Sequence, residues 1–216
     1  MDSKDQIVFV VDDDPRIGEA LSDLLTSLNF RVVVFASATE YIRFPKPDLP
    51  TCLILDVRLP DINGLDLQGQ LAARDHPPIV FISGHGDIPS SVRAIKQGAI
   101  DFLPKPFARQ HLLQAIKEAF AQDARSRLQR AELAELQLRF SLLTRRERDV
   151  LPLVVSGLLN KQAAAELGIS EITLQIHRGQ IMRKMAARSL AELVRMAGKL
   201  EVPVPSCQPL SHIKSL

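Results

Sequence analysis

The chain has 216 residues, 46% of them hydrophobic, which suffices for one large domain or two small ones, each with its own core. No apolar run approaches the roughly 18 residues of a membrane span, and residues 1–5 do not resemble a signal peptide. We therefore expect a cytoplasmic protein with no membrane partner. The only cysteines, Cys52 and Cys207, provide neither a disulfide framework nor a thiolate metal site.

The net charge of +2 conceals a difference between the two halves of the chain. Residues 1–122 contain 12 Lys and Arg against 16 Asp and Glu, whereas residues 141–199 contain 10 against 5. This contrast predicts an acidic module joined to a basic one. A basic module is compatible with nucleic-acid binding, although many basic faces are only solvated surface.

Apolar runs alternate with helical patterns along the first half. Predicted strands are 6–11, 31–35, 53–56, 78–83 and 99–103. Predicted helices begin near Asp14, Ala38, Gly64, Pro89 and Ala108, and those from Ala38, Gly64 and Pro89 end near Phe44, Ala73 and Gln97. Five strands alternating with five helices predict an α/β fold with a doubly wound five-stranded parallel sheet.

Polar residues stand where four of these strands end: Asp12 and Asp13, Asp56, Ser83 and Lys105. The carboxyl ends of parallel strands meet at one sheet edge, so these groups should converge. A lone aspartate at a strand end is more often a helix cap, but this combination favours phosphoryl chemistry on Asp56. Mg²⁺ or Mn²⁺ held by Asp13 and Asp56 would spread the charge of the phosphoryl group, and Lys105 and Ser83 would bind its oxygens.

An amphipathic pattern without Gly or Pro runs from Leu112 to Phe140. It predicts that the last helix of the first module continues as a long helical linker whose apolar stripe packs on another helix. Coiled-coil pairing is the less favoured alternative, because the heptads are few and irregular.

Helix signals follow in quick succession in the basic module. Thr144 and Glu147 form a capping box, Pro152 predicts a kink in the helix that follows, and Asn160 is predicted to cap the next helix. After the turn 168–170, Ser170 should cap a third helix reaching about residue 185, and a fourth starts at residue 189. Two short helices around a glycine turn predict a helix-turn-helix.

Helical spacing sorts the third helix into two faces. Leu174, Ile181, Met182 and Met185 form the predicted buried face, and Ile172, Gln175, Ile176, Gly179, Gln180 and Arg183 lie opposite. In a major groove the exposed isoleucines could contact thymine methyl groups, and Gln175 could hydrogen-bond to a base edge. Phosphate groups of the DNA backbone could be bound by Lys161, Arg178 and Lys184. The complete predicted DNA-contacting set is Lys161, Ser170, Ile172, Thr173, Gln175, Ile176, His177, Arg178, Gly179, Arg183 and Lys184.

Four motifs stand out in residues 5–120: Val10-Val-Asp-Asp-Asp14, Leu55-Asp-Val-Arg-Leu-Pro-Asp-Ile-Asn-Gly64, Ile82-Ser-Gly-His-Gly-Asp87 and Leu103-Pro-Lys-Pro-Phe107. Together they resemble the CheY-like receiver domain of two-component response regulators, and the third is similar to the FixJ-like branch. The resemblance implies that Asp56 is the phosphoacceptor and that Asp12, Asp13, Asp56 and the Arg58 backbone carbonyl surround Mg²⁺. It also implies Ser83 and Phe102 as switch residues, Lys105 as the phosphate-binding cation, and a cis Lys105–Pro106 bond.

Residues 141–200 resemble the LuxR/FixJ-type DNA-binding domain through Leu143-Thr-Arg-Arg-Glu, Gly157-Leu-Leu-Asn-Lys161, Leu167-Gly-Ile-Ser170 and Thr173-Leu-Gln-Ile-His-Arg178. Gln175 departs from the family pattern, in which Lys or Glu is common. We expect a receiver domain at 1–122, a helical linker at 123–140, a small all-α helix-turn-helix domain at 141–200 and a flexible tail at 201–216.

These features favour a transcription factor that a sensor histidine kinase phosphorylates on Asp56. We do not expect an enzyme, apart from the protein's own phosphorylation from a phosphodonor and its own dephosphorylation at Asp56. Expected partners are DNA, the kinase, a second copy once phosphorylated, and RNA polymerase. An aspartyl-phosphate phosphatase or phosphotransferase is the enzymatic alternative, but Val57 and Arg58 stand where a second general acid would follow the nucleophile. An RNA-binding antiterminator is the other alternative, and the turn at 168–170 argues against it.

Overall fold

A computed structural model of the chain describes residues 6–72, 76–84 and 88–203. Its contacts divide the chain into two compact units, Met1–Arg127 and Leu128–Leu216. The first unit contains β1 (Ile7–Val11), α1 (Pro15–Thr26), β2 (Arg31–Phe35), α2 (Ala38–Arg43), β3 (Thr51–Asp56), α3 (Gly64–Leu71), β4 (Ile79–Ser83), α4 (Ile88–Lys96) and β5 (Asp101–Pro104). Helix α5 (Arg109–Ser141) begins in this unit and ends in the second.

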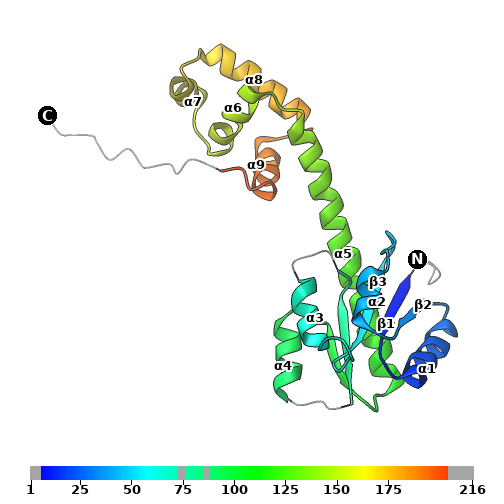
Figure 1. Cartoon of the computed structure of the whole chain (residues 1–216). Helices are drawn as coiled ribbons and strands as arrows, with labels where there is room; N and C mark the ends of the chain where they lie inside the picture. Colours follow the sequence, from blue (N-terminus) through cyan, green and yellow to red (C-terminus); the bar gives the residue numbers. More distant parts are fainter. Residues whose placement is uncertain (1–5, 73–75, 85–87, 204–216) are drawn as a thin grey trace. The chain divides into compact units, whose positions relative to one another are not determined.

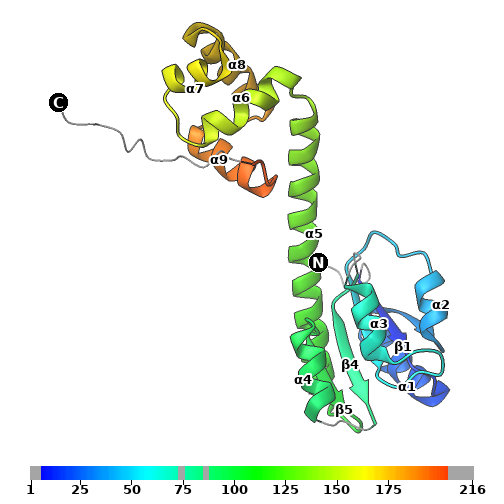
Figure 2. The same ribbon diagram turned by 60° about the vertical axis from the view of Figure 1, so that its left-hand side comes forward.

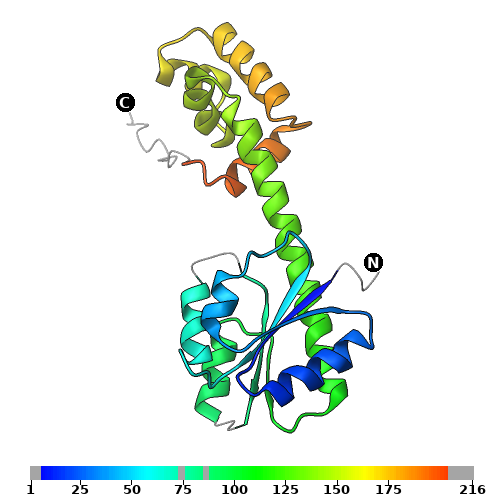
Figure 3. The same ribbon diagram turned by 45° about the vertical axis from the view of Figure 1, so that its right-hand side comes forward.

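All strand pairs of the first unit are parallel, and the order across the sheet is β2-β1-β3-β4-β5. The three central strands are buried along their whole length, as expected for apolar runs covered on both faces. From β1 the chain first moves to β2 at one edge and then returns to β3 on the other side of β1, so the carboxyl edge between β1 and β3 is the topological switch point. Figure 3 shows the sheet between its flanking helices. The predicted doubly wound five-stranded sheet is confirmed.

Helices cover both faces of this sheet (Figure 1). One core contains Phe9, Phe35, Tyr41, Leu67 and Phe81, from strands and from α2 and α3. The other core is formed with α1 and α5, whose contributions are Leu21, Leu25, Leu112, Ile116 and Phe120. Alternate residues of each strand enter opposite cores, which explains why the strands read as continuous apolar runs.

Helix α5 is one continuous helix of 33 residues (Figure 2), as the uninterrupted pattern predicted. Near the end of the first unit its buried Asp123 accepts a hydrogen bond from the Thr51 backbone N–H, at 3.0 Å. Arg127, one turn later, pairs with Asp48 and donates to the Leu49 carbonyl oxygen at 3.2 Å. These contacts fasten the helix to the start of β3, the strand that ends at Asp56.

The second unit packs the end of α5 with α6 (Arg145–Val155), α7 (Asn160–Leu167), α8 (Glu171–Lys184) and α9 (Leu190–Lys199). Its core contains Leu143, Leu151, Leu174, Ile181 and Leu193. Thr144 and Glu147 form the predicted capping box, and Ser170 caps α8 as expected. Helix α6 continues through Pro152 to Val155. Gly168 ends α7 with φ +65°, a conformation that glycine adopts without strain.

One prediction about local structure was wrong. Asn160 does not cap α7: it is the first helical residue, and the preceding Leu159 N–H donates to Gln162 Oε1 at 3.0 Å. In the linker part of α5, Leu136 is buried, whereas Leu128 and Leu138 are 64% and 65% exposed; packing of these two leucines on another helix stays a prediction. Two observed bounds differ from the predicted ones by about two residues: α3 ends at Leu71 instead of Ala73, and β5 begins at Asp101 instead of Ala99.

Within the described residues, no helix is long and apolar enough to cross a membrane. Cys207 and the predicted tail beyond residue 203 lie outside the described residues, as does the segment 85–87 of the third receiver motif.

A buried ion pair in the second unit makes a prediction about stability. Glu147, 4% exposed, accepts hydrogen bonds from Lys184 Nζ at 2.7 Å and from the Thr144 N–H at 2.7 Å. Burial raises the pKa of Glu147, but the bonds from Lys184 and Thr144 outweigh burial and lower it. A lowered folded-state pKa contributes stability above the ordinary glutamate pKa, and that stability is lost as pH falls through the lowered value.

Glu147→Gln should therefore destabilise the second unit by about 1–3 kcal/mol at neutral pH, because it removes the charge paired with Lys184. Urea unfolding at several pH values measures the difference from wild type. The difference should shrink on acidification below the ordinary glutamate range. A difference that is the same at every pH would contradict this role of the carboxylate.

Candidate functional site: carboxylates at the sheet edge and an exposed helix face

Asp56 is the last residue of β3, and β3 lies between β1 and β4. Asp12 directly follows β1, and Ser83 ends β4, so both stand at the same edge as Asp56. Asp12, Asp56 and Ser83 are 2%, 7% and 1% exposed, whereas Asp13 is exposed. The predicted convergence at the carboxyl edge is thus present in the structure.

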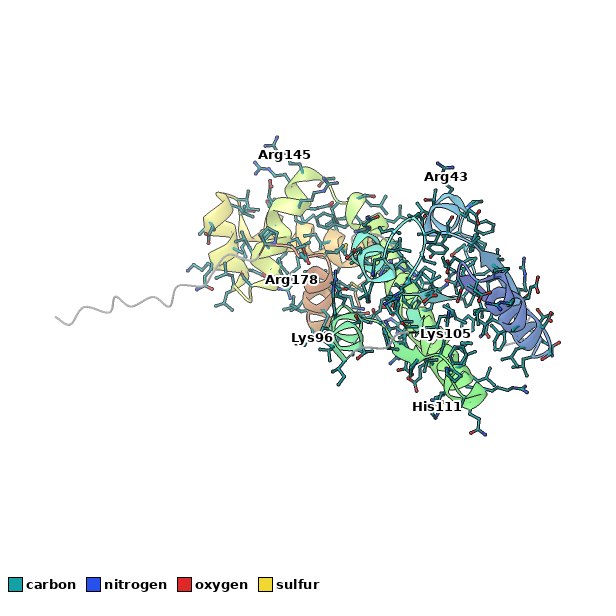
Figure 4. All side chains as sticks on the ribbon, turned by 60° about the horizontal axis from the view of Figure 1, so that its bottom comes forward. Arg43, Lys96, Lys105, His111, Arg145 and Arg178 are labelled. Atoms are coloured by element: carbon teal, nitrogen blue, oxygen red, sulfur yellow. The ribbon has the colours of Figure 1, made fainter. Side chains whose placement is uncertain are left out.

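Lys105 supplies the cation of this cluster (Figure 4). Its Nζ lies 2.6 Å from Asp12 Oδ2 and 3.1 Å from Asp56 Oδ2. Its own backbone N–H donates to the Ser83 carbonyl oxygen at 2.7 Å, which holds the residue beside β4. The Lys105–Pro106 peptide bond that follows is cis, as the resemblance implied.

Burial raises the pKa of Asp56, and the hydrogen bond and charge of Lys105 offset that rise only in part. For Lys105, burial lowers the pKa, but the hydrogen bonds to Asp12 and Asp56 outweigh burial and raise it. The ammonium is therefore stabilised by the carboxylates that it joins.

Oxygen ligands suitable for a metal ion gather here. Carboxylate oxygens of Asp12, Asp13 and Asp56 all lie within 4.8 Å of one another. The three donors are hard carboxylate oxygens, without a histidine or cysteine among them, and this donor set fits a divalent cation such as Mg²⁺ or Mn²⁺. One lysine charge against three carboxylates leaves an excess of negative charge that a divalent cation would neutralise.

The turn after β3 packs tightly against Asp56. The Gly64 N–H donates to the Val57 carbonyl oxygen at 2.8 Å, and a Cβ at Gly64 would lie 2.3 Å from the Asp56 carbonyl oxygen. The Arg58 N–H approaches Asp56 Oδ1 at 3.4 Å. The sequence indicated Gly64 only as the start of a helix, but the close approach makes it a positioning residue for Asp56.

Phe102 is half-buried, and its ring lies 6.1 Å from that of Phe81. Phe102 lies on β5, which pairs with β4. In this pairing Ser83 of β4 stands opposite Pro104 of β5. The predicted switch pair therefore lies on neighbouring strands, two residues apart in register.

The second unit presents a separate candidate surface on α8. Ile172 and Ile176 are 72% and 58% exposed, and Gln175 is exposed between them. Leu174 and Ile181 are fully buried on the other face. The predicted division into two faces is confirmed at these positions, whereas Gln180 and Met182, predicted on opposite faces, are both half-buried. Exposed apolar side chains beside an exposed amide form a face suited to a major groove.

Three predicted cations of this surface differ in their surroundings. Lys161 is exposed. Arg178, labelled in Figure 4, donates to Asn160 Oδ1 at 3.1 Å and so ties α8 to α7, while Lys184 pairs with the buried Glu147. Of the remaining predicted residues, Gly179 and Arg183 are exposed, Thr173 and His177 are half-buried, and Ser170 accepts from the Thr173 N–H.

Family models match both halves of the chain. The model of the response regulator receiver domain matches residues 8–117, and that of bacterial regulatory proteins of the luxR family matches residues 141–197. The chain belongs to the two-component response regulators that join a receiver to a LuxR-type DNA-binding domain. Proteins with this combination are transcription factors rather than classical enzymes. DNA and a sensor kinase are the partners that the two domains imply.

Relatives share this organisation over nearly the whole chain. Nodulation protein W of Bradyrhizobium diazoefficiens is 50% identical over 91% of this chain and 87% of its own length. The transcriptional regulatory protein FixJ of Azorhizobium caulinodans is 41% identical over 88% of this chain and 90% of its own length. The solved structure of the response regulator StyR is 48% identical and covers 90% of this chain and 99% of its own, with a TM-score of 0.75.

The carboxylate cluster predicts a metal requirement. Asp13→Ala should weaken Mg²⁺ or Mn²⁺ binding by at least about tenfold, because it removes one oxygen ligand without touching the core. Titration calorimetry with Mn²⁺ measures the change, and Asp23→Ala, an exposed aspartate on α1, is the matched control. If Asp13→Ala binds Mn²⁺ as tightly as the control, Asp13 is not a ligand.

Proposed function

We propose that Asp56 is phosphorylated by a sensor histidine kinase in a Mg²⁺-dependent reaction, and that phosphorylation promotes dimerisation on DNA and thereby regulates transcription. The observation that carries this proposal is the placement of Lys105 Nζ between Asp12 and Asp56, 2.6 and 3.1 Å from their oxygens. The domains proposed are the receiver at 1–122, the linker at 123–140 and the DNA-binding domain at 141–200.

In this proposal a carboxylate oxygen of Asp56 attacks the phosphorus of the donor, and the bond from phosphorus to the donor breaks as the acyl phosphate forms. A bound divalent cation, held by Asp12, Asp13, Asp56 and the Arg58 carbonyl, would neutralise charge on the transferred group. Lys105 is close enough to Asp56 to bind one phosphoryl oxygen from where it already stands.

Ser83 and Phe102 are proposed to report the modification. Ser83 lies beside Asp56 at the carboxyl edge, and its hydroxyl would turn towards a phosphoryl oxygen. The space beside Phe102 would then change, together with the surface formed by α4 and β5. Pairing of two copies would place two α8 helices on successive major grooves, roughly 34 Å apart.

Asp56→Asn should abolish labelling by acetyl phosphate, because an amide cannot form the acyl phosphate. Intact-protein mass spectrometry after incubation with acetyl phosphate and Mg²⁺ measures the added phosphoryl group. Asp66→Asn, an exposed aspartate on α3, is the control that should label normally. Labelling of Asp56→Asn at the normal rate would contradict the assignment of the phosphoacceptor.

The proposed DNA contacts are of two kinds, those to base edges and those to phosphates. Gln175→Ala should relax base preference at one position of the site, at a cost of about 1–3 kcal/mol for the preferred base. Lys161→Ala should weaken binding to all sequences alike and lower the salt slope by about one. Selection of random DNA and titration at several salt concentrations test both. Unchanged base preference for Gln175→Ala would remove it from the base-reading set.

A further inference from the structure

The last turns of α5 belong to the second unit and contact two of its helices. Glu132 pairs with Lys199 Nζ, at the end of α9, at 2.6 Å. Two turns later, Arg139 Nη1 donates to the Met185 carbonyl oxygen at 3.2 Å, at the end of α8 (Figure 1). Phe140 packs in the core of the same unit. This part of α5 is therefore built into the helical unit that carries α8.

The Arg139 side chain is oriented by its own helix. It is half-buried, and its Nη2 donates to Glu135 Oε1, one turn earlier on α5. A guanidinium is planar and carries its N–H donors in a fixed arrangement, so the bond to Glu135 directs another donor towards Met185. The positive charge also suits the end of α8, where the helix dipole places partial negative charge.

The turn that follows α8 is strained. Ala186 has φ +55°, a left-handed conformation that favours glycine, and it comes directly after Met185. Its N–H donates to the Arg183 carbonyl oxygen at 3.1 Å, so the turn closes tightly on the end of the helix. A strained conformation persists only where its surroundings hold it. Arg139, bound to the Met185 carbonyl oxygen, provides such a hold from another helix.

The outward residues of α8 lie towards its other end. Ile172, Gln175 and Ile176 are exposed there. At 1.5 Å per residue, Gln175 stands about 15 Å from Met185 along the helix axis. A tilt of about 10° around the Met185 end would displace Gln175 by about 2–3 Å, which is enough to break a hydrogen bond to a base edge. The direction in which α8 is held therefore matters for base contacts.

We propose that Arg139 is a positioning residue for DNA recognition. By binding the Met185 carbonyl oxygen it sets the direction of α8, and so places Gln175 and its neighbours for base contacts. Arg139 itself does not contact DNA in this account. The inference rests on the proposed function only in taking α8 as the helix that reads DNA. It adds that the end of α5 belongs to the apparatus that reads the bases.

Binding of the full chain to two DNA duplexes tests the proposal. One duplex is selected from random DNA by the wild-type protein, the other has the same composition in scrambled order, and every protein is treated with acetyl phosphate and Mg²⁺. Arg139→Ala should bind the selected duplex at least about fivefold more weakly than wild type, and the scrambled duplex within about twofold. Base contacts depend on the direction of α8, whereas non-specific binding depends mainly on charge.

Equal losses on the two duplexes would overturn the proposal. A partly unfolded protein would lose affinity for both by the same factor. A direct phosphate contact would also weaken both, and its removal would lower the salt slope by about one. Arg125→Ala is the matched control, because Arg125 is an exposed arginine of the same helix that donates to the Ala121 carbonyl oxygen, within α5, at 3.1 Å. This variant should discriminate between the duplexes as wild type does.

Two further variants examine the contact itself. Arg139→Lys keeps a charged donor and should recover part of the discrimination that Arg139→Ala loses. Ala186→Gly relieves the strain of the turn, because glycine adopts positive φ freely, and should reduce the effect of Arg139→Ala when the two are combined. A combined variant that discriminates no better than Arg139→Ala would contradict the part assigned to the turn.

Hydrogen exchange followed by mass spectrometry separates positioning from general stability. In Arg139→Ala, exchange should be faster over residues 181–187 and unchanged in α6 and α9. Exchange that is unchanged over residues 181–187, or faster throughout the second unit, would overturn the proposal.

Failure of this proposal is distinguishable from failure of the proposed function. If wild type discriminates between the duplexes and Arg139→Ala discriminates equally well, the proposed function stands and Arg139 is not a positioning residue. If wild type does not discriminate between them, the proposed function fails. Exchange over residues 181–187 then decides by itself whether Arg139 holds the end of α8.

Discussion

The structure of the first unit depends on the crowding of carboxylates at one edge of a parallel sheet. Asp12 and Asp56 are both buried there, and only Lys105 is recorded within ion-pair distance of them among the described residues. Like charges this close repel strongly in a partly buried site, so the cluster is stable only with a cation nearby. The same excess of negative charge makes the edge a fitting site for a divalent cation.

Among the described helices and strands, α5 is the one that both units share. Asp123 and Arg127 fasten the helix to the segment that leads into β3. Phe140 near its end, and Leu143 in the turn that follows, pack in the core of the second unit. A helix with side-chain contacts in both units is suited to carry a change from one unit to the other.

Much of this organisation was predictable from sequence, because strands that end in polar residues and helices that begin with caps are local signals. Asp56, Asp12, Ser83 and Lys105 were placed together for that reason. Long-range partners were not predictable. Local rules predicted Asn160 as a helix cap and Lys184 as a phosphate contact. In the structure Asn160 accepts a hydrogen bond from Arg178, and Lys184 pairs with the buried Glu147. Periodicity likewise indicated apolar faces on α5 without showing which face is covered.

The central claim is that chemistry at Asp56 changes the affinity of α8 for DNA. Fluorescence anisotropy with one labelled operator, measured on the same protein before and after acetyl phosphate, tests it most directly. With Mg²⁺ present, the account predicts that affinity rises between about 5- and 150-fold, the usual range for coupling between two sites, and that chelation of the metal before treatment prevents the rise. Equal affinities before and after complete phosphorylation would contradict the account.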